Sequence, residues 1–197
     1  MLSIDNISFS YGENPVLENF LLSVGDGERI CLFGKSGCGK TTLLRIILGL
    51  EKAQKGSVTA SRDIKYSAVF QEDRLLPFKT VLQNITLIGA DEQTALSHLA
   101  AMGIRDCADK YPSELSGGMR RRAAIARALS AEYDCLVLDE PFSGLDSENI
   151  RKAAEHISEC LSGRTLILVT HAKEEAQLLG CKIIPAEKNT SDTEKPF

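Results

Sequence analysis

The segment Gly34–Thr41 has the sequence Gly-Lys-Ser-Gly-Cys-Gly-Lys-Thr, which is the pattern of a phosphate-binding loop. Its glycines let backbone N–H groups turn inward, and a helix that begins behind the loop adds unpaired amides and its positive dipole end. The Lys40 ammonium can then reach the β- and γ-phosphates of a nucleotide, and the Thr41 hydroxyl can ligate Mg²⁺. The alternative, an ordinary glycine-rich turn, is disfavoured because the match is complete and lies between a strand pattern and a helix pattern.

Two adjacent acids, Asp139 and Glu140, follow the apolar run 135–138. In a phosphate-loop fold this strand neighbours the loop, so Asp139 can hold Mg²⁺ directly or through water. Glu140 lies one residue further out, where it can accept a proton from a water molecule aligned with the terminal phosphate. The alternative is that both acids merely solubilise the end of a strand. The phosphate loop upstream favours the catalytic interpretation.

A second anion-binding device is predicted where Ser116, Gly117 and Gly118 precede a helix over 123–131. The hydroxyl, the flexible amides and the helix dipole would all face one ligand, although an ordinary N-cap is the simpler alternative. The arginines at 120–122 are typical of a solvated helix face or of ion pairs between lobes.

The elements that must position these residues follow from the apolar patterns. We expect strands over 5–11, 16–24, 29–33, 57–60, 64–70, 135–139 and 165–169, with turns at 12–15 and 25–28. We expect a helix directly after the phosphate loop and another near 147–161. Residues 72–130 are predicted to be mostly helical, with Leu96, Leu99 and Met102 forming an apolar stripe. The candidate binding and catalytic residues are thus expected at the ends of strands and at the beginnings of helices in an α/β core.

Bulk properties exclude several classes of protein. The chain has 197 residues, a net charge of −4 and six scattered cysteines without a C-x-x-C pair. The charge gives no reason to expect nucleic acid as the main partner. The cysteine usage is typical of a reducing compartment and argues against a disulfide framework and against a zinc site. No signal peptide and no membrane-spanning run is evident, so any membrane role would come through another chain.

With these motifs in this order, the sequence resembles ATP-binding cassette (ABC) ATPases, the nucleotide-binding subunits of ABC transporters, from Leu2 to about Ile184. The resemblance implies an α/β P-loop NTPase fold with a mixed or parallel core sheet, an N-terminal antiparallel β subdomain and an inserted helical subdomain. A single domain over 1–197 would comprise a core over about 1–71 and 131–184, a helical insertion over about 72–130 and a polar tail over 185–197.

The resemblance also implies roles for individual residues. Tyr11 would stack on adenine. Gln71 would touch Mg²⁺ and the attacking water, and His171 would contact the γ-phosphate. The Walker A residues would bind the phosphates: Gly34, Lys35, Ser36, Gly37, Cys38, Gly39, Lys40, Thr41 and Thr42.

In the same family pattern, Asp139 is the Walker B metal ligand beside Thr41 and Gln71, and Glu140 is the base. Ser116, Gly117 and Gly118 would close over ATP bound to the opposite subunit, and the D-loop 143–146 would lie at the dimer seam. Met119 and Ala172 depart from the commonest family pattern, which has glutamine and aspartate there.

The implied function is ATP hydrolysis with Mg²⁺ that drives a transporter. The segment 71–81 resembles nitrate, sulfonate and taurine importers, so the expected partners are a second copy, a membrane permease and a solute-binding protein, with no nucleic acid. The expected location is cytoplasmic, on the inner face of the membrane. Two alternatives stay open: an ATP-gated clamp or scaffold outside transport, and a small kinase whose helical insertion is a lid.

Overall fold

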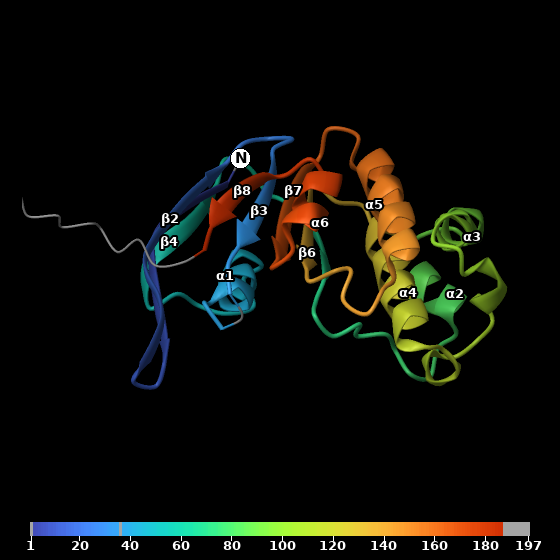
Figure 1. Ribbon diagram of the computed structural model, residues 1–197. Helices are drawn as coiled ribbons and strands as arrows, with labels where there is room; N and C mark the ends of the chain where they lie inside the picture. Colours follow the sequence, from blue (N-terminus) through green and yellow to red (C-terminus); the bar gives the residue numbers. More distant parts are fainter. Residues whose placement is uncertain (1, 36, 187–197) are drawn as a thin grey trace, which may run out of the picture.

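A five-stranded parallel sheet forms the centre of the computed structural model, which describes residues 2–35 and 37–186. Its strands lie in the order β5, β6, β7, β3, β8 (Figure 1). Their bounds are Tyr66–Val69 for β5, Cys135–Asp139 for β6, Thr165–Thr170 for β7, Arg29–Phe33 for β3 and Lys182–Pro185 for β8. The strand β8 was not predicted from sequence, because a four-residue run that lies half-exposed at a sheet edge gives little apolar signal.

A separate antiparallel sheet has the order β2, β1, β4, formed by Asn14–Val24, Leu2–Tyr11 and Lys55–Ala60. The turn between β1 and β2 is shorter than the expected 12–15, because Asn14 and Pro15 already pair with Tyr11 and Ser10. Pro15 is tolerated in β2 because this strand lies at the sheet edge. The strand β4 likewise begins at Lys55, two residues before the expected 57–60. Gly56 is required there, since a Cβ atom would lie 2.3 Å from the Asp5 carbonyl oxygen.

The helix α1, Lys40–Ile47, packs between the two sheets. Alternate side chains of β6 point to opposite faces of the parallel sheet. Val137 packs with α1 and the antiparallel sheet in one core cluster. Leu136 and Leu138 pack with the helices on the opposite face. This alternation explains why the run 135–138 is continuously apolar, because the strand is buried on both faces. Each buried leucine contributes about 1.5–3 kcal/mol to folding.

Of the remaining helices, the first four along the chain gather at the other end of the molecule, and the last lies beside β7 (Figure 1). They are α2 (Val81–Thr86), α3 (Glu92–Ala101), α4 (Gly117–Ser130), α5 (Ser147–Leu161) and α6 (Lys173–Leu178), with short 3₁₀ turns at Arg105–Cys107 and Pro112–Glu114. The apolar stripe expected in this part is present, with Leu99 and Met102 buried and Leu96 half-buried. The helix α4 extends beyond the expected 123–131 at its N-terminal end, because Ser116 caps it there.

No helix among the described residues is both long and apolar enough to cross a lipid bilayer. The division into a core and a helical insertion with boundaries near 71 and 131 stays a prediction. At the C-terminal end, Pro185 pairs with Phe33, and the Ala186 N–H donates a 2.8 Å hydrogen bond to the Phe33 carbonyl. The rest of the predicted tail, 187–197, lies outside the described residues.

Candidate functional site

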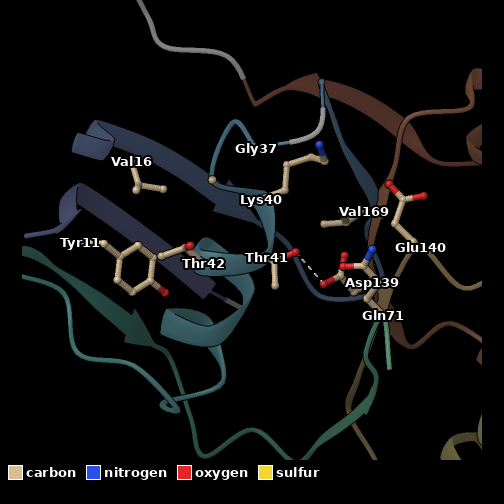
Figure 2. Close-up of a pocket in the computed structure, with 11 residues that line it drawn as sticks. Tyr11, Val16, Gly37, Lys40, Thr41, Thr42, Gln71, Asp139, Glu140 and Val169 are labelled. Atoms are coloured by element: carbon tan, nitrogen blue, oxygen red, sulfur yellow. Dashed lines mark hydrogen bonds between the residues drawn. The ribbon is translucent and has the colours of Figure 1, made fainter. Parts of the chain in front are cut away.

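A cavity of about 330 Å³ opens where α1 begins, beside the carboxyl ends of the parallel strands (Figure 2). Tyr11 and Val16 lie on one side of α1, and Gln71, Asp139 and Glu140 lie on the other. Among the described residues, the lining is Tyr11, Val16, Gly37, Gly39, Lys40, Thr41, Thr42, Gln71, Asp139, Glu140 and Val169. Residues from five separate stretches of sequence thus meet around one space.

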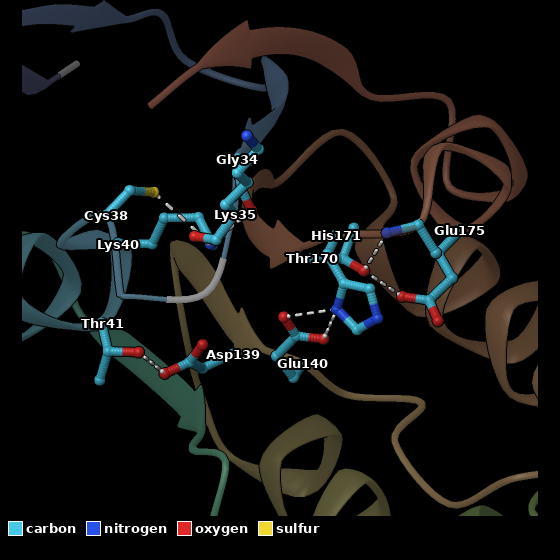
Figure 3. Close-up of polar contacts among 11 residues, drawn as sticks. Gly34, Lys35, Cys38, Lys40, Thr41, Asp139, Glu140, Thr170, His171 and Glu175 are labelled. Atoms are coloured by element: carbon cyan, nitrogen blue, oxygen red, sulfur yellow. Dashed lines mark hydrogen bonds and ion pairs between the residues drawn. The ribbon is translucent and has the colours of Figure 1, made fainter. Parts of the chain in front are cut away.

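The loop before α1 is tightly folded around the buried Lys40 side chain. The Lys40 ammonium donates 2.7 Å hydrogen bonds to the carbonyl oxygens of Gly34 and Lys35 and lies 3.6 Å from Cys38 Sγ (Figure 3). Gly39 has φ 94°, and a Cβ atom there would lie 2.9 Å from the Val16 carbonyl oxygen. Only glycine fits both the backbone angle and this approach. Ser36, also expected in this loop, lies outside the described residues.

Asp139 reaches Thr41 although β7 lies between β6 and β3 in the sheet. The Thr41 hydroxyl donates a 2.8 Å hydrogen bond to Asp139 Oδ2. Asp139 is only 1% exposed, and its Oδ1 is a buried oxygen without a hydrogen-bond partner among the described residues. A hydroxyl and a carboxylate with a spare buried oxygen, facing a cavity, are a donor set that suits Mg²⁺.

Burial raises the pKa of the Asp139 carboxyl, and the hydrogen bond from Thr41 counteracts part of this rise. The negative charge of neighbouring Glu140 raises the pKa further, and the Lys40 ammonium lowers it. A desolvated carboxylate that lacks a full set of partners is therefore costly in this position, and a cation beside it would reduce that cost.

Glu140 has a left-handed backbone, with φ 49°, although glutamate rarely adopts this conformation. Its N–H donates a 2.9 Å hydrogen bond to the Val169 carbonyl, which continues the sheet one residue beyond β6. Its carboxylate lies 2.9 and 3.0 Å from His171 Nδ1, which comes from the end of β7 (Figure 3). This contact raises the pKa of His171. The two adjacent acids therefore have separate partners and point to different parts of the site.

Gln71 lines the cavity, and its backbone is held by α4. The guanidinium of buried Arg121 donates a 2.6 Å hydrogen bond to the Phe70 carbonyl and another to the Gln71 carbonyl, and it pairs with Asp73 at 3.3 Å. The sequence suggested a solvated face or ion pairs for this arginine run. Arg121 forms such an ion pair but is buried, so it is a structural anchor of the cavity wall.

Three predicted binding residues, Ser116, Gly117 and Gly118, do not line the cavity. Ser116 is the N-cap of α4 and accepts a 3.2 Å hydrogen bond from the Met119 N–H. A Cβ atom on Gly118 would lie 3.4 Å from the Gly144 carbonyl oxygen, so this segment lies against the 143–146 loop of the same chain. Ser116 therefore caps α4, and one chain alone does not bring this segment to the phosphate loop. Its expected role toward ATP on a second subunit stays a prediction.

Two valines complete the cavity without any sequence signal. Val16 follows the β1–β2 turn, and Val169 lies in β7 two residues before His171. A valine in a strand is ordinarily a packing residue, so nothing in the sequence distinguished them. Together with the half-exposed Tyr11 ring, Val16 gives one end of the cavity an apolar character, while lysine, hydroxyl and carboxylate groups occupy the other.

A family model described as ABC transporter matches residues 17–143. The chain belongs to the ABC transporter family. It is 39% identical over 191 residues to an aliphatic sulfonates import ATP-binding protein of Paracoccus denitrificans, covering 93% of this chain and 78% of that relative. It is 37% identical over 206 residues to a bicarbonate transport ATP-binding protein of Synechocystis, covering 93% and 73%.

Solved structures agree with this assignment. A dimeric ATP-binding cassette in a post-hydrolysis state, bound to ADP and Pi, has a TM-score of 0.83 with 29% identity and covers 94% of this chain and 95% of its own. The chain accordingly has the P-loop fold of ABC ATPases and is an ATP-hydrolysing subunit of this family. Its remaining residue assignments belong to the function proposed below.

Proposed function

We propose that this ABC ATPase powers a membrane importer for a small anionic solute, by closing and opening as an ATP-bridged dimer. The observation that carries the proposal is the contact between the phosphate loop and the acidic strand end, in which Thr41 donates to Asp139 at the floor of the cavity. The relatives named for the import of aliphatic sulfonates and the transport of bicarbonate support an anionic solute.

In this proposal the triphosphate binds along the loop from Gly34 to Thr42. The Lys40 ammonium exchanges its contacts with the Gly34 and Lys35 carbonyls for phosphate oxygens, and inward-turned amides of the glycine-rich turns bind the remaining oxygens. Tyr11, on the apolar side of the cavity beside Val16, stacks on the adenine. Thr41, Asp139 and Gln71 hold Mg²⁺, which neutralises charge that develops on the phosphates.

Glu140 orients the attacking water and accepts its proton, because its carboxylate faces the cavity from the strand end. His171 is an exposed imidazole that donates to this carboxylate. It holds the Glu140 side chain in one orientation, and the proposal assigns it a contact with the terminal phosphate. Hydrolysis then depends on positioning and electrostatics, without a covalent enzyme intermediate.

A second copy completes each site. Ser116, Gly117 and Gly118 lie outside the cavity of their own chain, yet they combine a hydroxyl and amides at the N-terminus of the fourteen-residue helix α4. In a two-fold arrangement each copy presents this segment to its partner's phosphates. ATP then stabilises the closed pair, and hydrolysis removes the bridging charge.

A permease docks on the helical end of the molecule. The segment Leu75–Phe78 follows Gln71, and its Phe78 side chain is 89% exposed while Leu76 is also exposed. Aromatic and aliphatic side chains left in water beside a polar rim are typical of a docking surface. The binding of nucleotide at Gln71 can thus be communicated to the partner along a short stretch of chain.

Recovery of the chain with its membrane partner tests this function. Tagged protein is expressed in its native cell and purified from detergent-solubilised membranes. We expect a multi-spanning protein to co-purify, to be lost with Phe78→Ser and to be retained with Leu178→Ser, which removes another exposed apolar side chain, from α6. Both variants should unfold at the temperature of the parent. Recovery from the soluble fraction alone would contradict the transporter assignment and favour the clamp alternative.

A further inference from the structure

A cluster of three metal-binding side chains lies far from the cavity described above, where α3 contacts α5. His98 projects from α3, and His156 and Cys160 project from α5. His98 Nδ1 lies 2.8 Å from His156 Nε2, and Cys160 Sγ lies 3.7 Å from the same nitrogen. The three ligand atoms all lie within 4.8 Å of one another.

The surroundings leave these atoms able to ligate. All three residues are half-buried, with the His156 side chain 15% exposed, so the cluster is sheltered but can be reached from solvent. Burial, with a contribution from His156, lowers the pKa of His98, and a neutral imidazole offers a lone pair to a cation. Glu159 Oε2 lies 3.6 Å from His156 Nδ1, on the side of the ring away from the cluster. A carboxylate in this position orients a metal-bound imidazole.

The distances are close to those of a tetrahedral zinc site. Zn–N bonds of about 2.0 Å and Zn–S bonds of about 2.3 Å give ligand separations of about 3.3 Å between two nitrogens and about 3.5 Å between nitrogen and sulfur. The separation of 3.7 Å between His156 and Cys160 is near this value. The imidazole pair at 2.8 Å has to open by about half an ångström, which small side-chain rotations can supply.

Hydrogen bonds would explain each of these approaches, but both contacts converge on one atom, His156 Nε2, which has either one proton or one lone pair to offer. Cys160 follows His156 by four residues, which places both on one face of α5. The nearby Arg164 guanidinium donates to the Cys160 carbonyl at 2.8 Å and lies over the Tyr133 ring. Burial and the neighbouring Glu159 carboxylate raise the pKa of the Cys160 thiol, and the Arg164 guanidinium counteracts part of this rise. Binding of a cation would release the thiol proton to solvent.

We propose that His98, His156 and Cys160 form a binding site for a zinc-class divalent cation that joins α3 to α5. Two imidazoles and one thiolate leave a fourth position for water. The absence of a C-x-x-C pair argued against a zinc site from sequence, but the ligands here come from two helices, and only the His156–Cys160 spacing is local. The site does not depend on the proposed transport function.

Direct titration tests the site. The full chain, reduced and freed of metal, is titrated with Zn²⁺ against a chromogenic chelator without nucleotide. We expect one tight equivalent, and at least a tenfold loss of affinity in His98→Gln, His156→Gln and Cys160→Ser. Cys181→Ser removes another half-buried thiol and should keep the equivalent. Asp139→Asn should also keep it, which separates this site from the phosphate cavity.

Cobalt substitution and thermal unfolding give independent readouts. Bound Co²⁺ should show the intense visible bands of tetrahedral coordination and a thiolate-to-cobalt charge-transfer band, and Cys160→Ser should lose the latter. Zn²⁺ should raise the unfolding temperature of the parent and of Cys181→Ser but not of His98→Gln or its alternative His98→Ala. Failure of the parent to bind an equivalent, or retention of the same affinity by all three ligand variants, would overturn the proposal.

Discussion

At the scale of single residues, the site separates two neighbouring carboxylates by environment. Asp139 is buried and bonded to Thr41, whereas Glu140 turns through a left-handed backbone toward His171. Adjacent residues within a strand point to opposite faces, but Glu140 lies one residue beyond the end of β6, where this rule no longer applies. The sequence alone could therefore predict the pair of acids but not the direction in which each side chain points. The left-handed φ of Glu140 is a tertiary feature, because it follows from the β6 exit and the hydrogen bond to Val169.

Replacing Glu140 by glutamine tests its role as the base. Glu140→Gln keeps the shape and the contact with His171 but removes the proton acceptor, so ATP should still bind while hydrolysis falls by about 100-fold or more. Because the bridging phosphate is retained, the variant should accumulate as a dimer with ATP. Steady-state phosphate release and size-exclusion chromatography with ATP measure both effects. Turnover at the parent rate would exclude Glu140 as the base.

The contact between His171 and Glu140 should show itself in a pH titration. The Glu140 carboxylate raises the pKa of His171 above its ordinary value of about 6.5. The contact is therefore present below about pH 6.5, as long as Glu140 is ionised, and is lost as pH rises through the raised pKa. NMR of the His171 ring in the nucleotide-free parent should give a pKa above the ordinary histidine value. In Glu140→Gln the pKa of His171 should fall toward about 6.5. An unchanged value would show that the carboxylate does not influence the imidazole.

At the scale of elements, Arg121 joins the helix that begins at Ser116 to the strand exit that carries Gln71. The sequence identified α4 and the Gln71 segment separately, and its apolar patterns located α5, β3, β6 and β7 closely. These elements are buried and strongly patterned. The contact of Arg121 in α4 with the backbone at Gln71 could not be predicted, because it depends on which arginine of the run 120–122 faces inward.

Loss of Arg121 should destabilise the fold. Arg121→Ala removes the donors to two backbone carbonyls and the ion pair to Asp73, and we expect the free energy of unfolding to fall by about 3 kcal/mol. Arg121→Lys should recover only part, since an ammonium lacks the planar fork. Urea denaturation measures the change. As a control, Arg120→Ala removes a half-exposed side chain, its 2.8 Å hydrogen bond to the Leu115 carbonyl and a 3.9 Å ion pair, and it should cost about 1 kcal/mol or less. Equal losses in both alanine variants would contradict the anchor.

At the scale of the whole molecule, the predicted site residues form two groups. The first group lines the cavity or contacts its lining, as Lys35 and His171 do through Lys40 and Glu140. The second group, Ser116, Gly117 and Gly118, lies elsewhere against the 143–146 loop. The sequence pattern could assign both groups to one reaction but could not show their separation within a chain. The cluster of His98, His156 and Cys160 was missed for a similar reason, since 58 residues separate the two histidines. Only the contacts between distant segments in the folded chain show which of these residues lie together.

Mixing two inactive variants tests the shared site. Ser116→Arg should bind ATP as a monomer but fail to hydrolyse it, because the arginine blocks the segment that faces the partner's phosphate. A heterodimer of Ser116→Arg and Glu140→Gln contains one site with both damaged halves and one intact site. An equimolar mixture should therefore recover about a quarter of the parent ATPase rate if the chains pair at random and the sites act independently.

The mixture must be prepared before ATP is added, because ATP would lock the Glu140→Gln chains into pairs with each other. A chain with both substitutions is the control and should restore nothing when mixed with either single variant. Hydrolysis by Ser116→Arg alone, at the rate of the parent, would contradict the shared site.

The left-handed backbone at position 140 also affects how the protein can change. Asparagine and glycine suit this conformation better than glutamate does, so the local geometry disfavours the very side chain proposed to drive turnover. Selection for heat resistance alone would tend to replace it, and selection for activity would restore it. A glutamate retained at this position therefore lowers the stability of the fold in favour of catalytic activity.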